Sequence, residues 1–147
     1  MGEVFVATKA LILKNGKILV IKQKFDGKEY LDLPGGRMEY GLTPEENIKK
    51  EVKEELGVDV KIIGLVGVYQ FFRFSDKNQV VCIVYLCEPI SKKIDLNLNP
   101  DKTENIFWFK WVKPSEFVKL ESYPFKGLED MKRLVTNYFK NEYKKRR

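Results

Sequence analysis

The start of the chain alternates between apolar and polar stretches in a way that predicts a β-hairpin. Apolar and β-branched residues predominate in 4–13 and 17–21, and Asn15-Gly16 lies between these two stretches. Asn-Gly supplies the positive φ angles that a two-residue hairpin turn requires. The charged stretch 22–29 then predicts a loop before the next strand.

Further apolar runs predict the rest of a sheet, and two of these runs flank a polar turn at 75–78. We expect the run before this turn to pair back on the run after it. Gly64 and Gly67 lie in the earlier run, which therefore forms either one strand or two. The runs lie at 30–33, 58–74, 79–86 and 106–112, and a short helix is expected to open at Pro114.

The helix signals are strongest in the middle of the chain. Thr43 is a good N-cap, and Pro44 suits the first helical position. Glu46 stands three residues after Thr43 and completes a capping box. Gly57 suits the C-terminal stop, so we expect a helix over residues 44–56.

The last part of the chain, about 127–145, predicts an amphipathic helix. Its apolar residues recur at helical spacing: Leu128, Met131, Leu134, Val135, Tyr138 and Phe139. Strands outnumber helices and are joined mainly by hairpins, so we expect an α/β fold with a mixed sheet and helices packed on it. The length suits one domain and no linker interrupts it, so residues 1–147 are expected to form a single domain.

Composition excludes several classes of protein. No apolar run approaches the roughly 20 residues of a membrane span, so we expect no membrane contact. No basic region precedes the first apolar stretch, so we find no secretory signal. Cys82 and Cys87 are an odd number of positions apart on one expected strand, which places them on opposite faces. We therefore expect reduced thiols and a cytoplasmic protein.

The chain contains no histidine, which removes Ser-His and Cys-His catalysis and His-based zinc sites. Acid–base chemistry must then use carboxylates, Lys, Tyr or Cys. The net charge is +6, and much of it lies in the terminal stretch KNEYKKRR. A basic tail can bind nucleic acid, but a solvated helix end is the simpler interpretation, and we do not expect a nucleic acid partner.

Three glutamates on the expected helix point to a metal site. At 100° per residue, Glu54 lies about 60° to one side of Glu51, and Glu55 lies about 40° to the other side. The three carboxylates share one wedge at the edge of the apolar face, where their repulsion costs stability unless a cation neutralises them. Hard oxygen ligands at this spacing suit Mg²⁺. A charged surface helix is the alternative. Gly35 and Gly36 let the backbone either approach a ligand closely or turn sharply before the helix, and together with the acidic helix at this spacing they favour a ligand site.

The 23 residues GRMEYGLTPEENIKKEVKEELGV, at 36–58, resemble the Nudix box GX5EX7REUXEEXGU, where U is a bulky aliphatic residue. The preceding Leu33-Pro34-Gly35 resembles the usual lead-in of that family. The resemblance implies a Nudix-type α/β/α sandwich with a mixed sheet and a loop–helix–loop catalytic motif. Two positions depart from the box, because Leu42 replaces a glutamate and Lys50 replaces an arginine. Lysine keeps the charge but loses the bidentate fork of arginine.

The resemblance also implies a mechanism. Water attacks one phosphorus of a diphosphate bridge, and Mg²⁺, or Mn²⁺ as a substitute, is held by Glu51, Glu54, Glu55 and the carbonyl of Gly36. Glu54 or Glu55 orients the water, and the general base is either a box glutamate or Glu104 in a downstream loop. Arg37 and Lys24 are candidate phosphate contacts, and solvated surface charge is the alternative for each.

The function implied is Mg²⁺-dependent hydrolysis of a nucleoside triphosphate, or of another nucleoside diphosphate linked to a group X, with release of a nucleoside monophosphate. An ADP-ribose or nucleotide-sugar pyrophosphatase is the alternative within the family, and the early start of the first strand favours triphosphates. The rival is a weakly catalytic domain that binds nucleotide or RNA, which Leu42 and Lys50 motivate and the intact glutamates oppose. The expected partner is a small nucleotide, and the protein is expected to be a monomer or a homodimer.

Overall fold

The computed structural model describes residues 2–25, 28–73, 77–90, 94, 108–120 and 128–143. The side chains of 23–25, 28–30, 108, 128 and 142–143 lie outside this description. In chain order the elements are β1 (Val4–Lys14), β2 (Lys17–Phe25), β3 (Lys28–Asp32), β4 (Gly35–Arg37), α1 (Pro44–Leu56), β5 (Val60–Arg73), β6 (Asn78–Pro89), β7 (Trp108–Val112), α2 (Pro114–Phe117), α3 (Leu128–Tyr138) and the π-helix η2 (Phe139–Tyr143).

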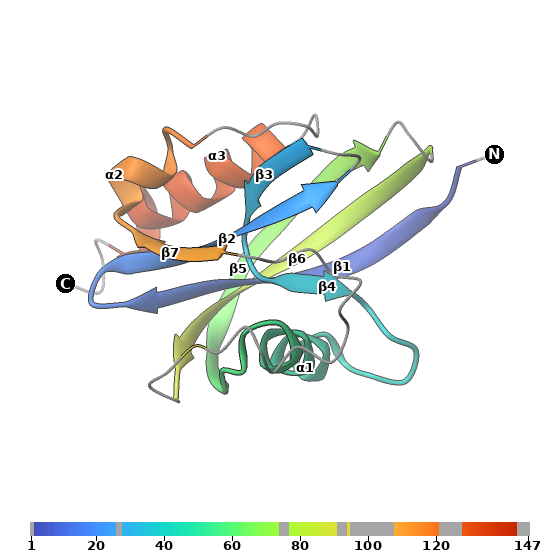
Figure 1. Ribbon diagram of the computed structural model, residues 1–147, viewed down its shortest axis with the longest axis horizontal. Helices are drawn as coiled ribbons and strands as arrows, with labels where there is room; N and C mark the ends of the chain where they lie inside the picture. The colour runs from blue at the N-terminus through green and yellow to red at the C-terminus, as the bar shows by residue number, and fades with distance from the viewer. Residues whose placement is uncertain are drawn as a thin grey trace.

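The strands form one mixed sheet with helices on both faces (Figure 1). The order along the sheet is β3-β2-β1-β6-β5, while β4 pairs with β1 and β7 pairs with β2. The β1–β6 pairing is parallel and the other pairings are antiparallel. Helix α1 covers one face, and α2 and α3 cover the other. This arrangement confirms the expected α/β/α sandwich.

Two hydrophobic clusters form the core, one on each face of the sheet. Strands β1, β2, β5, β6 and β7 contribute residues to both clusters, because successive side chains of a strand point to opposite faces. On β2, for example, Val20 packs toward α2 and α3, whereas Leu19 packs toward α1. On β6, Cys82 and Cys87 fall into different clusters, which confirms that they lie on opposite faces. Burial raises the pKa of Cys82 to about 11 and that of Cys87 to about 12.

Most of the local predictions are confirmed. β1 and β2 pair antiparallel around Asn15-Gly16, whose φ angles are both positive. Helix α1 spans Pro44–Leu56, begins with the capping box of Thr43 and Glu46, and ends at Gly57 in the left-handed conformation. β5 remains one strand, with irregular pairing near Gly64 and Gly67. No helix in the described part of the chain is long and apolar enough to cross a membrane.

Three features differ from the sequence prediction. The expected loop at 22–29 is wrong, because β2 continues to Phe25 and pairs with β3 from Lys28, despite its charged residues. Pairing with a neighbouring strand outweighs the low strand propensity of charged residues. β4 was not expected, and it forms because Gly35 and Gly36 let the chain lie against β1. The C-terminal helix changes to a π-helix after Tyr138, and residues 127 and 144–145 of its expected span lie outside the described residues.

Candidate active site

Helix α1 places Glu51, Glu54 and Glu55 at the border between core and surface. Ile48, Val52 and Leu56 are fully buried against the sheet. Glu51 and Glu55 are also buried, at 7% and 1% exposure, whereas the side chain of Glu54 is 34% exposed. The acidic wedge therefore lies at the edge of the buried face, as its helical spacing predicts.

Two glycines allow β4 to lie between β1 and α1. A Cβ atom at Gly35, whose φ is +149°, would collide with the backbone of Thr8 on β1. A Cβ atom at Gly36 would lie 2.5 Å from Oε2 and 2.7 Å from Cδ of Glu51. Glycine at position 36 thus brings the backbone of β4 directly against a buried carboxylate of α1.

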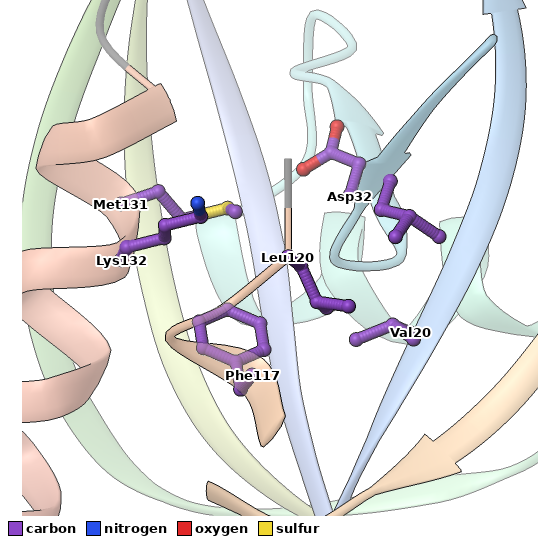
Figure 2. Close-up of a pocket in the computed structure, with 7 residues that line it drawn as sticks. Val20, Asp32, Phe117, Leu120, Met131 and Lys132 are labelled. Atoms are coloured by element: carbon purple, nitrogen blue, oxygen red, sulfur yellow. The ribbon is translucent and has the colours of Figure 1, made fainter. Parts of the chain in front are cut away.

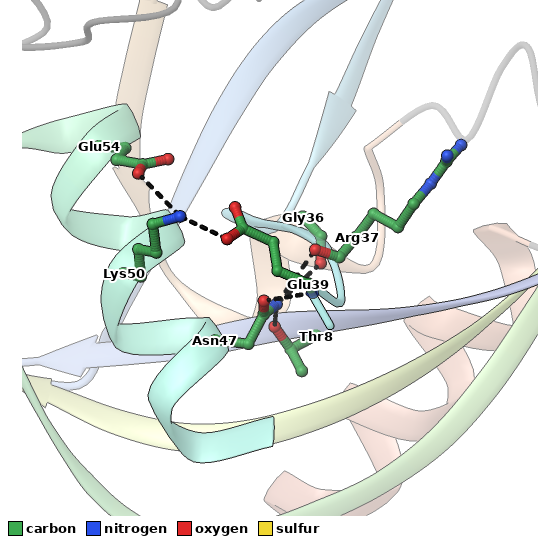
Figure 3. Close-up of polar contacts among 7 residues, drawn as sticks. All are labelled: Thr8, Gly36, Arg37, Glu39, Asn47, Lys50 and Glu54. Carbon is green, nitrogen blue, oxygen red and sulfur yellow. Dashed lines mark hydrogen bonds and ion pairs between the residues drawn. The ribbon is translucent and has the colours of Figure 1, made fainter. Parts of the chain in front are cut away.

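Asn47 ties this backbone to the helix, and its role was not predicted from the sequence. Its side chain is completely buried, and Nδ2 donates to Thr8 Oγ1 at 2.9 Å. The same amide donates to the carbonyl oxygens of Gly36 at 3.4 Å and Arg37 at 3.3 Å, while Oδ1 accepts the N–H of Glu39 at 3.0 Å (Figure 3). The sequence held one signal for this role: Asn47 is a polar residue four positions before Glu51, so helical spacing places it on the buried side of α1.

Lys50 links the loop after β4 to the C-terminal half of α1 (Figure 3). Its Nζ lies 2.5 Å from Glu39 Oε2 and 3.5 Å from Glu54 Oε1. The hydrogen bond to Glu39 raises the pKa of Lys50, with a smaller contribution from the charge of Glu54. Lys50 and Glu54 are four residues apart on α1, a spacing at which helical side chains meet, whereas Glu39 lies outside the helix and gave no such signal in the sequence.

The residues present fit a divalent cation of the Mg²⁺ type. Carboxylates and a backbone carbonyl are the hard oxygen donors that such ions prefer, and Gly36 and Glu51 are in direct apposition. Within the described residues, no three His, Cys, Asp or Glu side chains converge into a ready-made metal cluster. Mg²⁺ sites commonly use one or two carboxylates and take their other ligands from water and substrate phosphates, so this donor set is sufficient.

The remaining sequence candidates do not join this group. The exposed Arg37 lies over the ring of Phe5, with its Cζ 3.7 Å from the ring centroid, and points away from Lys50 and Glu54 (Figure 3). Lys24 lies on β2, but its side chain is outside the described residues, as is all of Glu104. The roles of these three residues stay predictions.

A small hollow lies on the sheet face opposite α1. It is lined by Val20, Leu31, Asp32, Phe117, Leu120, Met131 and Lys132, as Figure 2 shows for most of them. Asp32 is bound by Lys9 at 2.8 Å and by the N–H of Leu33 at 2.7 Å. The hollow has room of only about 10 Å³, about that of one water molecule. A space of this size does not admit a nucleobase.

Comparison with known proteins agrees with the fold and the box. The family model of the NUDIX domain matches residues 5–135. An ADP-ribose pyrophosphatase of Methanocaldococcus jannaschii is 32% identical over 136 residues, which are 92% of this chain and 73% of that protein. An 8-oxo-dGTP diphosphatase of Haemophilus influenzae is 29% identical over 91 residues, 58% of this chain and 63% of that protein.

A solved structure is similar over almost the whole chain. The crystal structure of a MutT protein from Methanosarcina mazei Go1 superimposes with a TM-score of 0.77 and covers 97% of both chains at 20% identity. At that identity the likeness concerns the fold alone. The family model matches residues 5–135, and the Methanocaldococcus jannaschii relative is 32% identical over 136 residues. These two matches, with the box on β4 and α1, show that this chain belongs to the Nudix family of pyrophosphohydrolases.

Proposed function

We propose that the protein hydrolyses the diphosphate bond of a nucleoside diphosphate linked to a further group, with Mg²⁺, and releases a nucleoside monophosphate. The observation that carries the proposal is the apposition of the Gly36 backbone and the buried Glu51 carboxylate. In a Nudix protein this is where the box brings its donors together. Three of the four box glutamates, Glu51, Glu54 and Glu55, are retained here. A domain that only binds nucleotide has no need for their mutual repulsion.

The roles of the residues follow from their exposure. Glu51 and the Gly36 carbonyl, aligned by Asn47, would hold the cation from the protein side. Glu55 is buried at 1% exposure, whereas the side chain of Glu54 is 34% exposed. Glu54 would therefore complete the cation site from the solvent side and is also better placed to meet an attacking water. When bound, Mg²⁺ polarises phosphoryl oxygens and lowers the pKa of water. Glu104 remains the alternative general base.

The two candidate substrate classes are ADP-ribose and the nucleoside triphosphates. The relative that spans 92% of this chain is named an ADP-ribose pyrophosphatase, and this likeness favours ADP-ribose. A shorter match is named an 8-oxo-dGTP diphosphatase, and it keeps nucleoside triphosphates as the second candidate. The likeness therefore shifts weight from the triphosphates expected from the sequence toward a nucleotide linked to a sugar.

The test incubates purified protein with Mg²⁺ or Mn²⁺ and with ADP-ribose, nucleotide sugars, triphosphates or dinucleoside polyphosphates, and separates the products by chromatography. Glu54→Gln removes one charge from the wedge, and Glu45→Gln, on the exposed first turn of the same helix, is the matched control. Release of a nucleoside monophosphate by the wild type and Glu45→Gln, but not by Glu54→Gln, is the expected result. No turnover together with salt-sensitive RNA binding would instead support the binding domain.

A further inference from the structure

The position of Lys50 depends on a carboxylate that the Nudix box does not specify. The box places glutamate where this chain has Leu42, so that carboxylate is absent here. In the structure Glu39, three residues earlier, reaches Lys50 at 2.5 Å. Both backbone polar groups of Glu39 form hydrogen bonds: its N–H donates to Asn47 Oδ1, and its carbonyl accepts the N–H of Leu42 at 3.3 Å.

Lys50 is shared unequally between two carboxylates. Its Nζ lies within hydrogen-bond reach of Glu39 Oε2, at 2.5 Å, whereas the contact with Glu54 Oε1, at 3.5 Å, is longer. The ammonium group is therefore held mainly by the loop after β4, and only weakly by the helix that carries both Lys50 and Glu54.

We propose that Glu39 is a positioning residue that replaces the carboxylate missing at Leu42, and that it holds Lys50 away from Glu54 so that the Glu54 carboxylate remains available to a divalent cation. This inference rests on the proposed metal role of Glu54. Among the described residues, Glu54 is the other ion-pair partner of Lys50. Without the Glu39 charge, the ammonium shifts toward Glu54 and competes with the metal for its oxygens.

The effect should appear in metal binding rather than in stability. The side chains of Lys50 and Glu39 are 42% and 45% exposed, and ion pairs at such exposure contribute little to the stability of the fold. Partners that orient metal ligands, by contrast, typically change metal affinity by roughly 10–100-fold when they are removed. For this half-exposed pair we expect the lower end of that range.

The test measures Mn²⁺ affinity in the absence of substrate, by the EPR signal of free Mn²⁺. Glu39→Gln should bind Mn²⁺ about tenfold more weakly than the wild type. Asp59→Asn is the matched control, because it breaks the ion pair of Asp59 with Lys53, at 3.2 Å and similar exposure, at the end of the same helix. It should leave the affinity unchanged. Thermal unfolding without metal should be alike in all three proteins.

A double-mutant cycle with Lys50→Met separates positioning from direct ligation. If Glu39 acts through Lys50, Glu39→Gln changes the affinity in the wild type and has no further effect in the Lys50→Met background. An equal loss in both backgrounds would make Glu39 a ligand itself and overturn the inference. An unchanged affinity of Glu39→Gln would overturn it as well. Failure of the wild type to bind Mn²⁺ would overturn the metal role of the box and this inference with it.

Discussion

Substitution of Gly36 by alanine tests the contact on which the candidate site depends. Position 36 is a strand residue of β4, and its backbone conformation is not restricted to glycine. The new methyl group would meet the carboxylate of Glu51, with Oε2 at 2.5 Å and Cδ at 2.7 Å. The main-chain carbonyl, a proposed metal ligand, is retained in this variant, so the change isolates the position of the carboxylate.

The magnitude follows from this distance. Ordinary van der Waals contact begins near 3.4 Å, so the carboxylate must withdraw by about 1 Å. The end of a glutamate side chain is flexible, and we expect a cost in the free energy of unfolding of only about 1 kcal/mol. A misplacement of about 1 Å in a catalytic site can lower the rate by roughly 100-fold. Activity should therefore fall far more than stability.

The assay compares kcat/KM with urea unfolding for Gly36→Ala and for the control Gly64→Ala, whose added Cβ would meet open space. The control should match the wild type in activity. In the double variant Gly36→Ala/Glu51→Gln, the alanine should add little to the loss caused by Glu51→Gln, because both changes act on one carboxylate. Full activity in a folded Gly36→Ala protein would refute the reasoning.

Three further predictions address the loop, the helix cap and the thiols. Asn47→Ala should lower the free energy of unfolding by about 2–3 kcal/mol, because buried polar groups lose their partner, and a loss below about 0.5 kcal/mol in urea denaturation would contradict the buried network. Thr43→Ala should cost about 1 kcal/mol of stability through the lost N-cap and leave kcat/KM unchanged; a large loss of activity would contradict a purely capping role. Burial raises the pKa of Cys82 from 9.0 to about 11, so its contribution to stability is complete below pH 9 and is lost as the pH rises toward 11. Cys82→Ala should show a shallower decline of stability over this range in urea titrations than the wild type, and equal slopes would show that the thiol does not titrate as its burial requires.

Features that depend on near neighbours in the chain could be predicted. The Asn15-Gly16 turn and the capping box of Thr43 and Glu46 each involve a few consecutive residues, whose backbone preferences are local. The angular wedge of Glu51, Glu54 and Glu55 follows from helical geometry alone, and the box spacing made the family recognisable. In these cases the sequence contains the whole physical cause.

The β2–β3 pairing shows where local propensity fails. Charged residues at 22–29 predicted a loop, yet β2 extends to Phe25 because β3 offers it a row of backbone partners on one side. Strand formation depends on which segment of the chain lies alongside, and this context outweighs the intrinsic preference of the residues. The parallel pairing of β1 with β6 likewise joins segments far apart in the sequence.

The candidate site also depends on contacts between segments that are distant in the sequence. Sequence alone determined the fold class, the limits of α1 and the set of carboxylates on one side of that helix. Only the tertiary structure decided that Gly36 lies against Glu51, that Asn47 joins β1 to β4, and that Lys50 meets Glu39. These contacts exist because β1, β4 and α1 pack together and bring distant residues within hydrogen-bond reach, a condition that periodicity along one helix does not contain.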